Sequence, residues 1–414
     1  MDKNIYKINR TNLLDKIKDD SVVILFAGNA PKKTADEAYR FTPNRNFYYL
    51  TGVEEENHIL VMSKIDGVEK SILFIKDIDL ELEKWIGKSL RKDEALEITA
   101  VDEVMFKSDF EGYLHKLIAV KEEFNLYLDL ERDGFNSPDS ISQSFAKEII
   151  SKYPQIRVRN IYGKIASERL VKSEEEIENI KKAIEITIAG VENLMKNAKA
   201  GMKEYELEAY FDFNCKSKGV KDLAFNTIAA AGKNATVLHY VDNDSEIKDG
   251  DLILFDLGAQ YKYYNADISR TFPVSGKFTE RQKEVYNAVL SVNEEIIKMI
   301  KPGVTTVEIN ERANDLLGEA CVKLGLLEDK KDFRKYYFHS IGHSLGLDTH
   351  DIVIDRNFTF APGMVYTVEP GLYIPEESIG IRIEDDILVT EDGCINLTKN
   401  MIKTVEEIEN FMKN

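Results

Sequence analysis

The sequence predicts an α/β domain followed by an α+β domain. Its 414 residues suit two or three domains of ordinary size. Short β-rich runs alternate with charged helical stretches in the first part, and long amphipathic helices flank strands in the second. The pattern changes near residue 165, so we expect domains at 1–165 and 166–414.

The N-terminal domain is predicted from four segments. Residues 22–26 and 71–75 are rich in Val, Ile, Leu and Phe, which favour strands. Residues 78–86 and 111–121 mix charged and apolar side chains as helices do. This alternation of strands and helices is typical of an α/β domain.

The C-terminal domain begins with a helix start signal. Ser173, followed three residues later by Glu176, is a capping-box pattern in which each side chain accepts a backbone N–H of the other residue. Apolar residues then recur at steps of three and four until Gly201, which predicts an amphipathic helix. Further helices are predicted at 205–218, 279–300 and 306–324, and strands at 252–257, 364–369 and 379–384.

Two aspartates stand within strand-forming segments of this domain. Asp256 interrupts the apolar run Leu252–Leu257, and Asp267 lies in the next extended segment. A hairpin that turns at Tyr261 and Lys262 would place the two carboxylates directly opposite each other. Two opposed carboxylates repel unless a cation or a shared proton lies between them, so the pairing indicates chemistry rather than packing.

Two glutamates repeat the arrangement downstream. A hairpin that turns at Glu376 and Glu377 would place Glu369 opposite Glu384. Either pair alone fits a surface hairpin with solvated acids as well as a functional site. Two pairs, each embedded in apolar strands, favour the functional site.

The histidines narrow the choice of site. A spacing of four residues separates His339 from His343, as in zincin helices, but the glutamate after the first histidine is missing and Gly342 disfavours a helix. We therefore reject a gluzincin. Four carboxylates and one imidazole form a hard, oxygen-rich set that suits two divalent ions, Mn²⁺ first, with Co²⁺ or Zn²⁺ as alternatives. The six histidines are His58 and His115, which we treat as structural, and His239, His339, His343 and His350.

These residues resemble a known family. The order Asp256, Asp267, His343, Glu369, Glu384 is similar to that of the dinuclear metallopeptidases with the pita-bread fold, which include methionine aminopeptidase, prolidase and aminopeptidase P. The resemblance implies a pita-bread C-terminal domain. The motifs that carry it lie at 256–259, 265–272, 339–351, 368–371 and 380–386.

The N-terminal domain carries a second resemblance. Residues 39–41 and 46–52 look like the N-terminal domain shared by aminopeptidase P and some prolidases, a domain that methionine aminopeptidase lacks. Residues 342–348, followed by His350 and Asp351, resemble aminopeptidase P, which removes an N-terminal residue that precedes proline. Prolidase, which cleaves Xaa-Pro dipeptides, is the alternative.

The resemblance also implies a role for each metal ligand. Asp256 would bind one ion and His343 the other, whereas Asp267 and Glu384 would share both. A hydroxide that bridges two divalent metals would attack the carbonyl carbon before proline. Glu369 would ligate a metal and also shuttle the proton to the leaving nitrogen.

Further residues are expected around these ligands. By the same resemblance His350 would stabilise the developing oxyanion, His239 would contact the substrate near the scissile bond, and His339 would line the pocket for proline. The alternative for each of these three histidines is a hydrogen bond to a neighbouring residue, with no direct role in the reaction. Arg382 would pair with Asp256 and keep it ionised, or form a plain cross-strand salt bridge. Tyr373 would donate a hydrogen bond into the site, or only pack in the core.

Composition limits the partners and the location. Asp and Glu number 73 against 55 Lys and Arg, a net charge of −18, which disfavours nucleic acids and anionic membranes. Neither a secretory signal nor a membrane-spanning run is expected. The widely spaced Cys215, Cys321 and Cys394 offer no disulfide framework, so we expect a reducing cytoplasm.

Two other functions remain on the basis of fold alone. A pita-bread domain can serve as a non-catalytic peptide-binding module after losing ligands, and creatinase-like enzymes share the two-domain layout without metals. The complete set of five ligands speaks against both. The family also suggests a homodimer or a higher homo-oligomer, and the expected partners are peptides with an N-terminal Xaa-Pro sequence.

Overall fold

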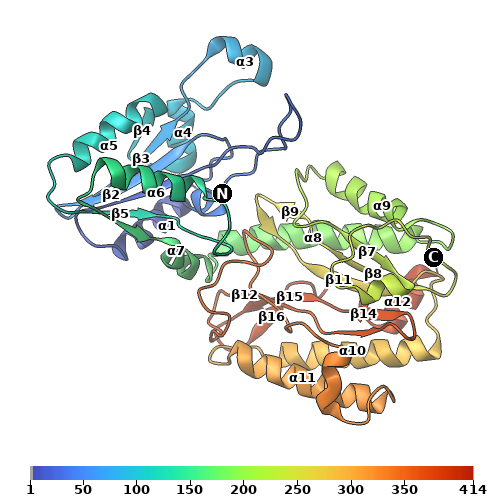
Figure 1. Cartoon of the computed structure of the whole chain (residues 1–414). Helices are drawn as coiled ribbons and strands as arrows, with labels where there is room; N and C mark the ends of the chain where they lie inside the picture. The colour runs from blue at the N-terminus through green and yellow to red at the C-terminus, as the bar shows by residue number, and fades with distance from the viewer. Residues whose placement is uncertain (1–2, 414) are drawn as a thin grey trace. The chain divides into compact units, whose positions relative to one another are not determined.

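Residues 3–413 are described by the computed structural model, and they form two compact units. The division lies between Glu168 and Arg169, at the end of helix α7 (Tyr162–Arg169). Figure 1 colours the first unit from blue to green and the second from green to red. Within residues 3–413, no helix has both the length and the apolar character that a membrane span requires.

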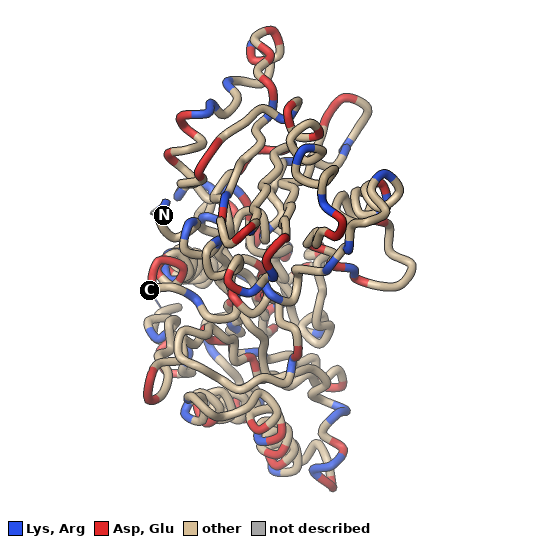
Figure 2. The backbone as a smooth tube through the Cα atoms, turned by 90° about the vertical axis from the view of Figure 1, so that its left-hand side faces the viewer, with Lys and Arg blue, Asp and Glu red and all other residues tan. Residues whose placement is uncertain are grey.

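Charged residues of both signs are interspersed along the backbone. Figure 2 shows short stretches of Lys and Arg alternating with Asp and Glu in both units rather than gathering in one segment. The described chain therefore offers no long basic run of the kind that binds a phosphate backbone.

The N-terminal unit is a mixed sheet of six strands in the order β4-β3-β2-β1-β5-β6. Strand β1 pairs antiparallel with β2 and parallel with β5, which confirms the predicted α/β alternation. Helices α5 and α6 share an apolar cluster with the sheet. The strands are β1 Ser21–Phe26, β2 Ile59–Ile65, β3 Val68–Ile75, β4 Glu103–Phe106, β5 Phe124–Leu128 and β6 Ile156–Asn160; the helices before α7 are α1 Lys3–Asp15, α2 Arg45–Thr51, α3 Leu80–Ile86, α4 Lys92–Thr99, α5 Phe110–Ile118 and α6 Ile141–Lys152.

The C-terminal unit packs helices on two sides of short antiparallel sheets. Figure 1 shows α8 and α9 on one side of the strands and α10 and α11 on the other. The paired strands are β11-β8-β7, β12-β15-β16, β13-β14 and β9-β10. The strands are β7 Ile228–Ala231, β8 Leu252–Leu257, β9 Gln260–Tyr261, β10 Tyr264–Asn265, β11 Ile268–Pro273, β12 Val365–Val368, β13 Gly371–Ile374, β14 Ile379–Arg382, β15 Asp385–Val389 and β16 Cys394–Asn396; the helices are α8 Glu174–Asn197, α9 Glu204–Ser217, α10 Glu280–Met299, α11 Thr306–Lys323 and α12 Val405–Met412, with 3₁₀ turns η2 Gly232–Thr236 and η3 Lys330–Lys335.

The start of helix α8 follows the predicted capping signal, and two further helices begin in the same way. Ser173 caps α8 with the reciprocal bonds of a capping box to Glu176, as expected. Thr279 and Thr305 cap α10 and α11 in the same way. Helix α8 ends at Asn197 rather than continuing to Gly201, because the chain becomes extended at Ala198.

The predicted register of the first hairpin is wrong by two residues. Asp256 pairs with Ser269, not with Asp267. The two-residue turn is formed by Lys262 and Tyr263, both at positive φ (48° and 65°), whereas Tyr261 remains in β9. Neither residue type signals such a turn, which usually contains Asn or Gly. A shift of two residues preserves the face of a strand, so both acids still point to the same side.

Close backbone contact accompanies this hairpin. A Cβ added at Gly258, between β8 and β9, would lie 1.9 Å from the carbonyl oxygen of Ala266. Only glycine allows the two segments to approach this closely. The approach brings Asp267 toward the end of β8.

The predicted register of the second hairpin is confirmed. Gly371 pairs with Arg382 on one side of the glutamates, and Val368 pairs with Asp385 on the other. The same register therefore continues through the gap between the two paired segments, where Glu369 and Glu384 face each other.

Candidate metal centre

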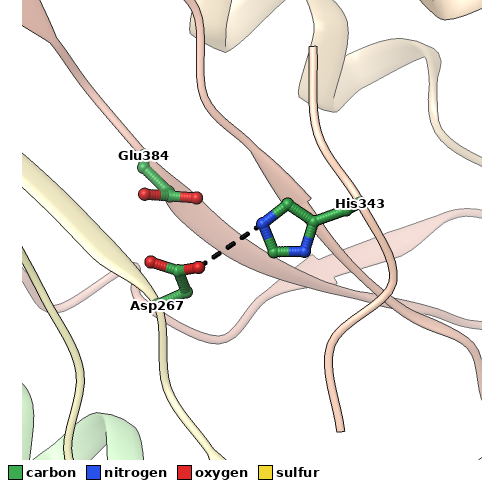
Figure 3. A group of neighbouring side chains, drawn as sticks. All are labelled: Asp267, His343 and Glu384. Atoms are coloured by element: carbon green, nitrogen blue, oxygen red, sulfur yellow. Dashed lines mark ion pairs between the residues drawn. The ribbon is translucent and has the colours of Figure 1, made fainter. Parts of the chain in front are cut away.

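Three side chains of the C-terminal unit converge on one point. Asp267, His343 and Glu384 each present one ligand atom, and these atoms all lie within 4.8 Å of one another. Figure 3 shows the two carboxylates and the imidazole facing a common space, with Nε2 of His343 3.4 Å from Oδ2 of Asp267. Two carboxylates and an imidazole at these separations suit a divalent cation.

Backbone pairing holds these side chains together. Asp267 directly precedes β11, and the backbone N–H of Glu384 donates to the carbonyl of Ser269 in β11 at 3.1 Å. His343 lies in an irregular segment, but its carbonyl accepts the N–H of Thr367 in β12 at 2.9 Å. The N–H of His343 also donates to Oγ1 of Thr367 at 3.1 Å. The imidazole is therefore fixed against a strand.

The two remaining predicted ligands border this group. Oε1 of Glu369 lies 3.8 Å from Nε2 of His343. Asp256 also borders the group, close enough for its carboxylate to act on Asp267. Burial first, and then this neighbouring charge, raise the pKa of Asp267 well above its usual range. The structure thus brings the five predicted ligands together from segments that lie far apart in the sequence.

One arginine reaches into the acidic cluster. Nη2 of Arg382 lies 2.6 Å from Oδ2 of Asp256, the contact that the sequence predicts. Its Nε donates to Oγ of Ser269 at 2.7 Å, and that hydroxyl donates to Oε2 of Glu384 at 2.9 Å. Its Nη1 donates to the hydroxyl of Tyr373 at 3.1 Å. Arg382 therefore orients several groups of the cluster and is more than a single salt bridge.

Tyr373 and His339 form one border of the cluster. The hydroxyl of Tyr373 lies 2.9 Å from Nε2 of His339, so this tyrosine makes polar contacts as well as packing in the core. Nδ1 of His339 lies 3.9 Å from Oε2 of Glu369. Burial, and then the charge of Arg382, lower the pKa of His339 to about 4, so its ring is neutral at pH 7.

Two further histidines lie near the cluster. The ring of His350 lies 4.2 Å from that of His343, centroid to centroid. Partial burial, and then the charge of His343, lower the pKa of His350 to about 4. His239 is exposed in the turn after η2, and its charge contributes to the lowered pKa of both His339 and His350. The contacts of these histidines with a substrate remain predictions.

The charge and hydrogen bonding of the cluster fit a bound cation. Burial, and then repulsion from Asp267 and Glu369, raise the pKa of Glu384 well above its usual range. Burial also raises the pKa of Glu369. Oδ1 of Asp256 and Oδ1 of Asp267 are buried without a hydrogen-bond partner among residues 3–413. A divalent cation would satisfy such oxygens and offset their charge.

The sequence reasoning missed two residues of this site. Ser269 connects Arg382 to Glu384, and only the correct hairpin register would have placed it beside Asp256. Asp386 is fully buried, and its Oδ2 accepts the backbone N–H of Asp267 at 3.3 Å. The run of three acids at 384–386 was the available signal for it.

Comparisons with known proteins agree with this geometry. Residues 178–391 match the metallopeptidase family M24, and residues 6–127 match the aminopeptidase P N-terminal domain. The chain belongs to metallopeptidase family M24. Within this family it is 35% identical to the Xaa-Pro aminopeptidase of Escherichia coli K12, over 98% of this chain and 97% of that protein. It is 34% identical to human Xaa-Pro aminopeptidase 3, over 94% of this chain and 80% of that protein.

Solved structures of M24 relatives superpose over the whole chain. One from Bacillus anthracis has a TM-score of 0.98 at 48% identity and covers 100% of this chain and 99% of that one. Zinc-substituted E. coli aminopeptidase P, in complex with product, has a TM-score of 0.92 at 33% identity and covers 100% and 98%. The expected order along the chain, an α/β aminopeptidase P domain followed by an α+β pita-bread domain, is therefore confirmed.

Proposed function

We propose that this M24 metallopeptidase is an Xaa-Pro aminopeptidase, which hydrolyses the bond between an N-terminal residue and a following proline. The convergence of Asp267, His343 and Glu384, with Glu369 and Asp256 beside them, carries the proposal. Identity to Xaa-Pro aminopeptidases along nearly the whole chain supports this specificity over the dipeptide specificity of prolidase.

The metal would be held by the five converging side chains. Asp256, Asp267, Glu369 and Glu384 offer carboxylate oxygens and His343 offers Nε2, a hard donor set for which we propose two ions, Mn²⁺ first, with Co²⁺ or Zn²⁺ as alternatives. When bound, such ions supply positive charge beside the substrate carbonyl and lower the pKa of water at the site.

The protein side chains would move the proton and bind the reacting groups. The carboxylate of Glu369, which lies 3.8 Å from Nε2 of His343 at the border of the cluster, is placed to take a proton from water and pass it to the proline nitrogen. Neutral His350 would donate a hydrogen bond to the developing oxyanion. His239 would contact the substrate near the scissile bond, and His339 would line the proline pocket. Arg382 would orient the carboxylate of Asp256 through their ion pair.

Peptide hydrolysis by metal-stripped and Mn²⁺-loaded protein tests the proposal. We expect the loaded protein to release the first residue from an Xaa-Pro-Yaa tripeptide and to leave a matched Xaa-Ala-Yaa tripeptide intact. Treatment with a chelator should abolish cleavage, and added Mn²⁺ should restore it. Cleavage of Xaa-Pro dipeptides alone would identify a prolidase, and cleavage of neither peptide would reject both activities.

Location and assembly belong to the same proposal. We propose a cytoplasmic location, which is supported by the three free cysteines. We also propose a homodimer or a higher homo-oligomer. Exposed apolar side chains of α3, with Trp85 at 86% and Leu80 at 67%, support contact with another copy. Sedimentation of the wild type and of Trp85→Lys would test the assembly.

A further inference from the structure

Glu204 is a fully buried carboxylate outside the acidic cluster. It is the first residue of α9 and is 0% exposed. Its Oε1 accepts the backbone N–H of Ala231 at 2.7 Å and Nδ2 of Asn234 at 3.0 Å. Its Oε2 accepts the hydroxyl of Tyr240 at 2.7 Å and the backbone N–H of Ser245 at 2.9 Å. One side chain thus binds four donors.

These four donors enclose the segment that carries His239. Ala231 ends β7 before the segment, and Ser245 follows it. Asn234 lies within η2, and Tyr240 directly follows His239. The carboxylate therefore ties both ends and the middle of residues 231–245 to one point. Since one buried carboxylate accepts all four bonds, the arrangement is rigid.

A second buried side chain, that of Asn243, fixes the end of the same segment to residues around β7. Oδ1 of Asn243 accepts the N–H of Ala229 at 3.0 Å, and its Nδ2 donates to the carbonyl of Thr227 at 2.9 Å. Asn243 is 2% exposed and has a φ of 47°, a conformation that asparagine tolerates. The segment is thus fixed to β7 independently of Glu204.

The turn η2 also touches the strand that carries Arg382. A Cβ added at Gly380 in β14 would lie 2.0 Å from the carbonyl oxygen of Ala235. Leu238 and Tyr240, the two neighbours of His239, pack partly buried against a cluster that contains Tyr373. His239 itself is exposed between them. Its place beside the metal cluster is therefore set by the residues around it.

We propose that Glu204 is a positioning residue, which holds His239 beside the metal cluster through the hydrogen-bonded segment 231–245. The inference rests on the proposed function of His239 as a substrate contact. A contact of this kind is effective only when it is held near its productive position, and a flexible loop would lose that position. Glu204 touches neither substrate nor metal and acts only through the segment.

Glu204→Gln tests the inference with little change of shape. A glutamine presents an NH₂ group to one of the two donor pairs, and each pair contains a backbone N–H that cannot accept a hydrogen bond. We expect kcat/KM for the Xaa-Pro-Yaa tripeptide to fall roughly 10- to 100-fold, the loss typical of residues that orient a functional group. Bound metal should stay at the wild-type level. Hydrogen exchange across 232–244 should become faster.

A double-variant cycle separates positioning from a general structural role. In a His239→Asn background, Glu204→Gln should reduce kcat/KM no further, because the group that it positions is already gone. A full additional loss in that background, or unchanged exchange across 232–244, would overturn the inference. Failure of wild-type cleavage would reject the proposed function instead, while the exchange measurement still decides the positioning.

Two further variants provide matched controls. Glu206→Gln makes the same substitution on the exposed side of α9, where the carboxylate only caps the N–H of Lys203, and should leave activity and exchange unchanged. Tyr240→Phe removes one of the four bonds and should give an intermediate loss. If Glu204→Gln fails to fold, Tyr240→Phe replaces it in the double-variant cycle with His239→Asn. Losses of kcat/KM that add up in the double variant would then contradict the inference.

Discussion

Glu384 and Asp385 are neighbours in the sequence and are both buried, yet their environments are opposite. The pKa of Glu384 is raised well above its usual range by burial and by repulsion from Asp267 and Glu369. Burial alone would raise the pKa of Asp385 as well, but two cationic side chains lower it to about 2. Those partners are Arg270 at 2.7 Å and Lys403 at 2.7 Å.

Asp351 resembles Asp385 in this respect. It is fully enclosed, and ion pairs with Arg169 at 2.5 Å and Lys172 at 3.0 Å lower its pKa despite burial. Among residues 3–413, by contrast, Arg382 is the one lysine or arginine within ion-pair distance of the acidic cluster, and it pairs with Asp256. The fold therefore gives Asp385 and Asp351 cationic partners of its own and leaves the acidic cluster for an external cation.

The neighbouring pair gives the largest expected effect. Asp385→Asn removes the shared partner of Arg270 and Lys403 and should lower the unfolding free energy of metal-free protein by about 3–5 kcal/mol. Glu384→Gln removes a repelled carboxylate and keeps an oxygen for Ser269, so it should leave that free energy unchanged or higher. Urea unfolding of both metal-stripped variants at pH 7 measures the difference.

Asp392→Asn is the matched control for this pair. Asp392 is exposed, so its substitution should change the unfolding free energy by less than about 0.5 kcal/mol. Equal destabilisation by Asp385→Asn and Glu384→Gln would remove the distinction between the two kinds of buried acid.

The next largest effect is expected at Asp267. Asp267→Asn should reduce metal affinity and kcat/KM by more than the roughly 100-fold loss seen when a residue that only orients ligands is removed. The fold should survive, because the substitution removes a charge and not a packed side chain. Bound metal and tripeptide turnover are the measurements. Wild-type stoichiometry and turnover would show that Asp267 is not a ligand.

A smaller effect concerns pH. A carboxyl group with a raised folded-state pKa binds its proton more tightly when folded, so stability falls as pH rises from the unfolded pKa through the folded one. Metal-free wild type should therefore lose stability relative to Glu384→Gln as pH rises above about 4.5, by at most about 1.4 kcal/mol per pH unit for each proton. His339 and His350 titrate in both proteins and cancel in this comparison.

Thermal unfolding at pH 5, 6 and 7 in the presence of chelator measures this slope. Asp385 should add little to it, since its pKa of about 2 and the usual value of 3.8 both lie below this window. Parallel stability curves for wild type and Glu384→Gln would contradict the raised pKa of Glu384.

The smallest effect is expected at the link between the cluster and its arginine. Ser269→Ala removes the hydroxyl that accepts from Arg382 and donates to Glu384, at a cost of about 1 kcal/mol, or about fivefold in metal affinity. Calorimetric metal titration compares it with the exposed control Ser275→Ala. A loss as large as that of Asp267→Asn would mean that Arg382 and Ser269 hold the ligands together.

The two hairpins show how far the sequence could predict this site. The register of Glu369 and Glu384 was correct, because Pro375 and the residues after it form the turn where turn residues were expected. The register of Asp256 and Asp267 was wrong, since Lys262 and Tyr263 adopt a left-handed turn that their residue types do not signal. The acids of the first hairpin still converged, because a shift of two residues preserves the strand face.

The sequence by itself determined the order of the ligands, the helix starts at Ser173 and Thr279, and the kind of chemistry that five hard donors allow. Local signals were sufficient there, because caps and strand alternation depend on neighbouring residues. Only the tertiary structure decided which buried acids receive a cation and which do not. Arg270 and Lys403 contact Asp385, and Glu204 contacts the segment that carries His239, across long distances in the sequence. The strength of such contacts depends on burial, and no local sequence pattern encodes burial.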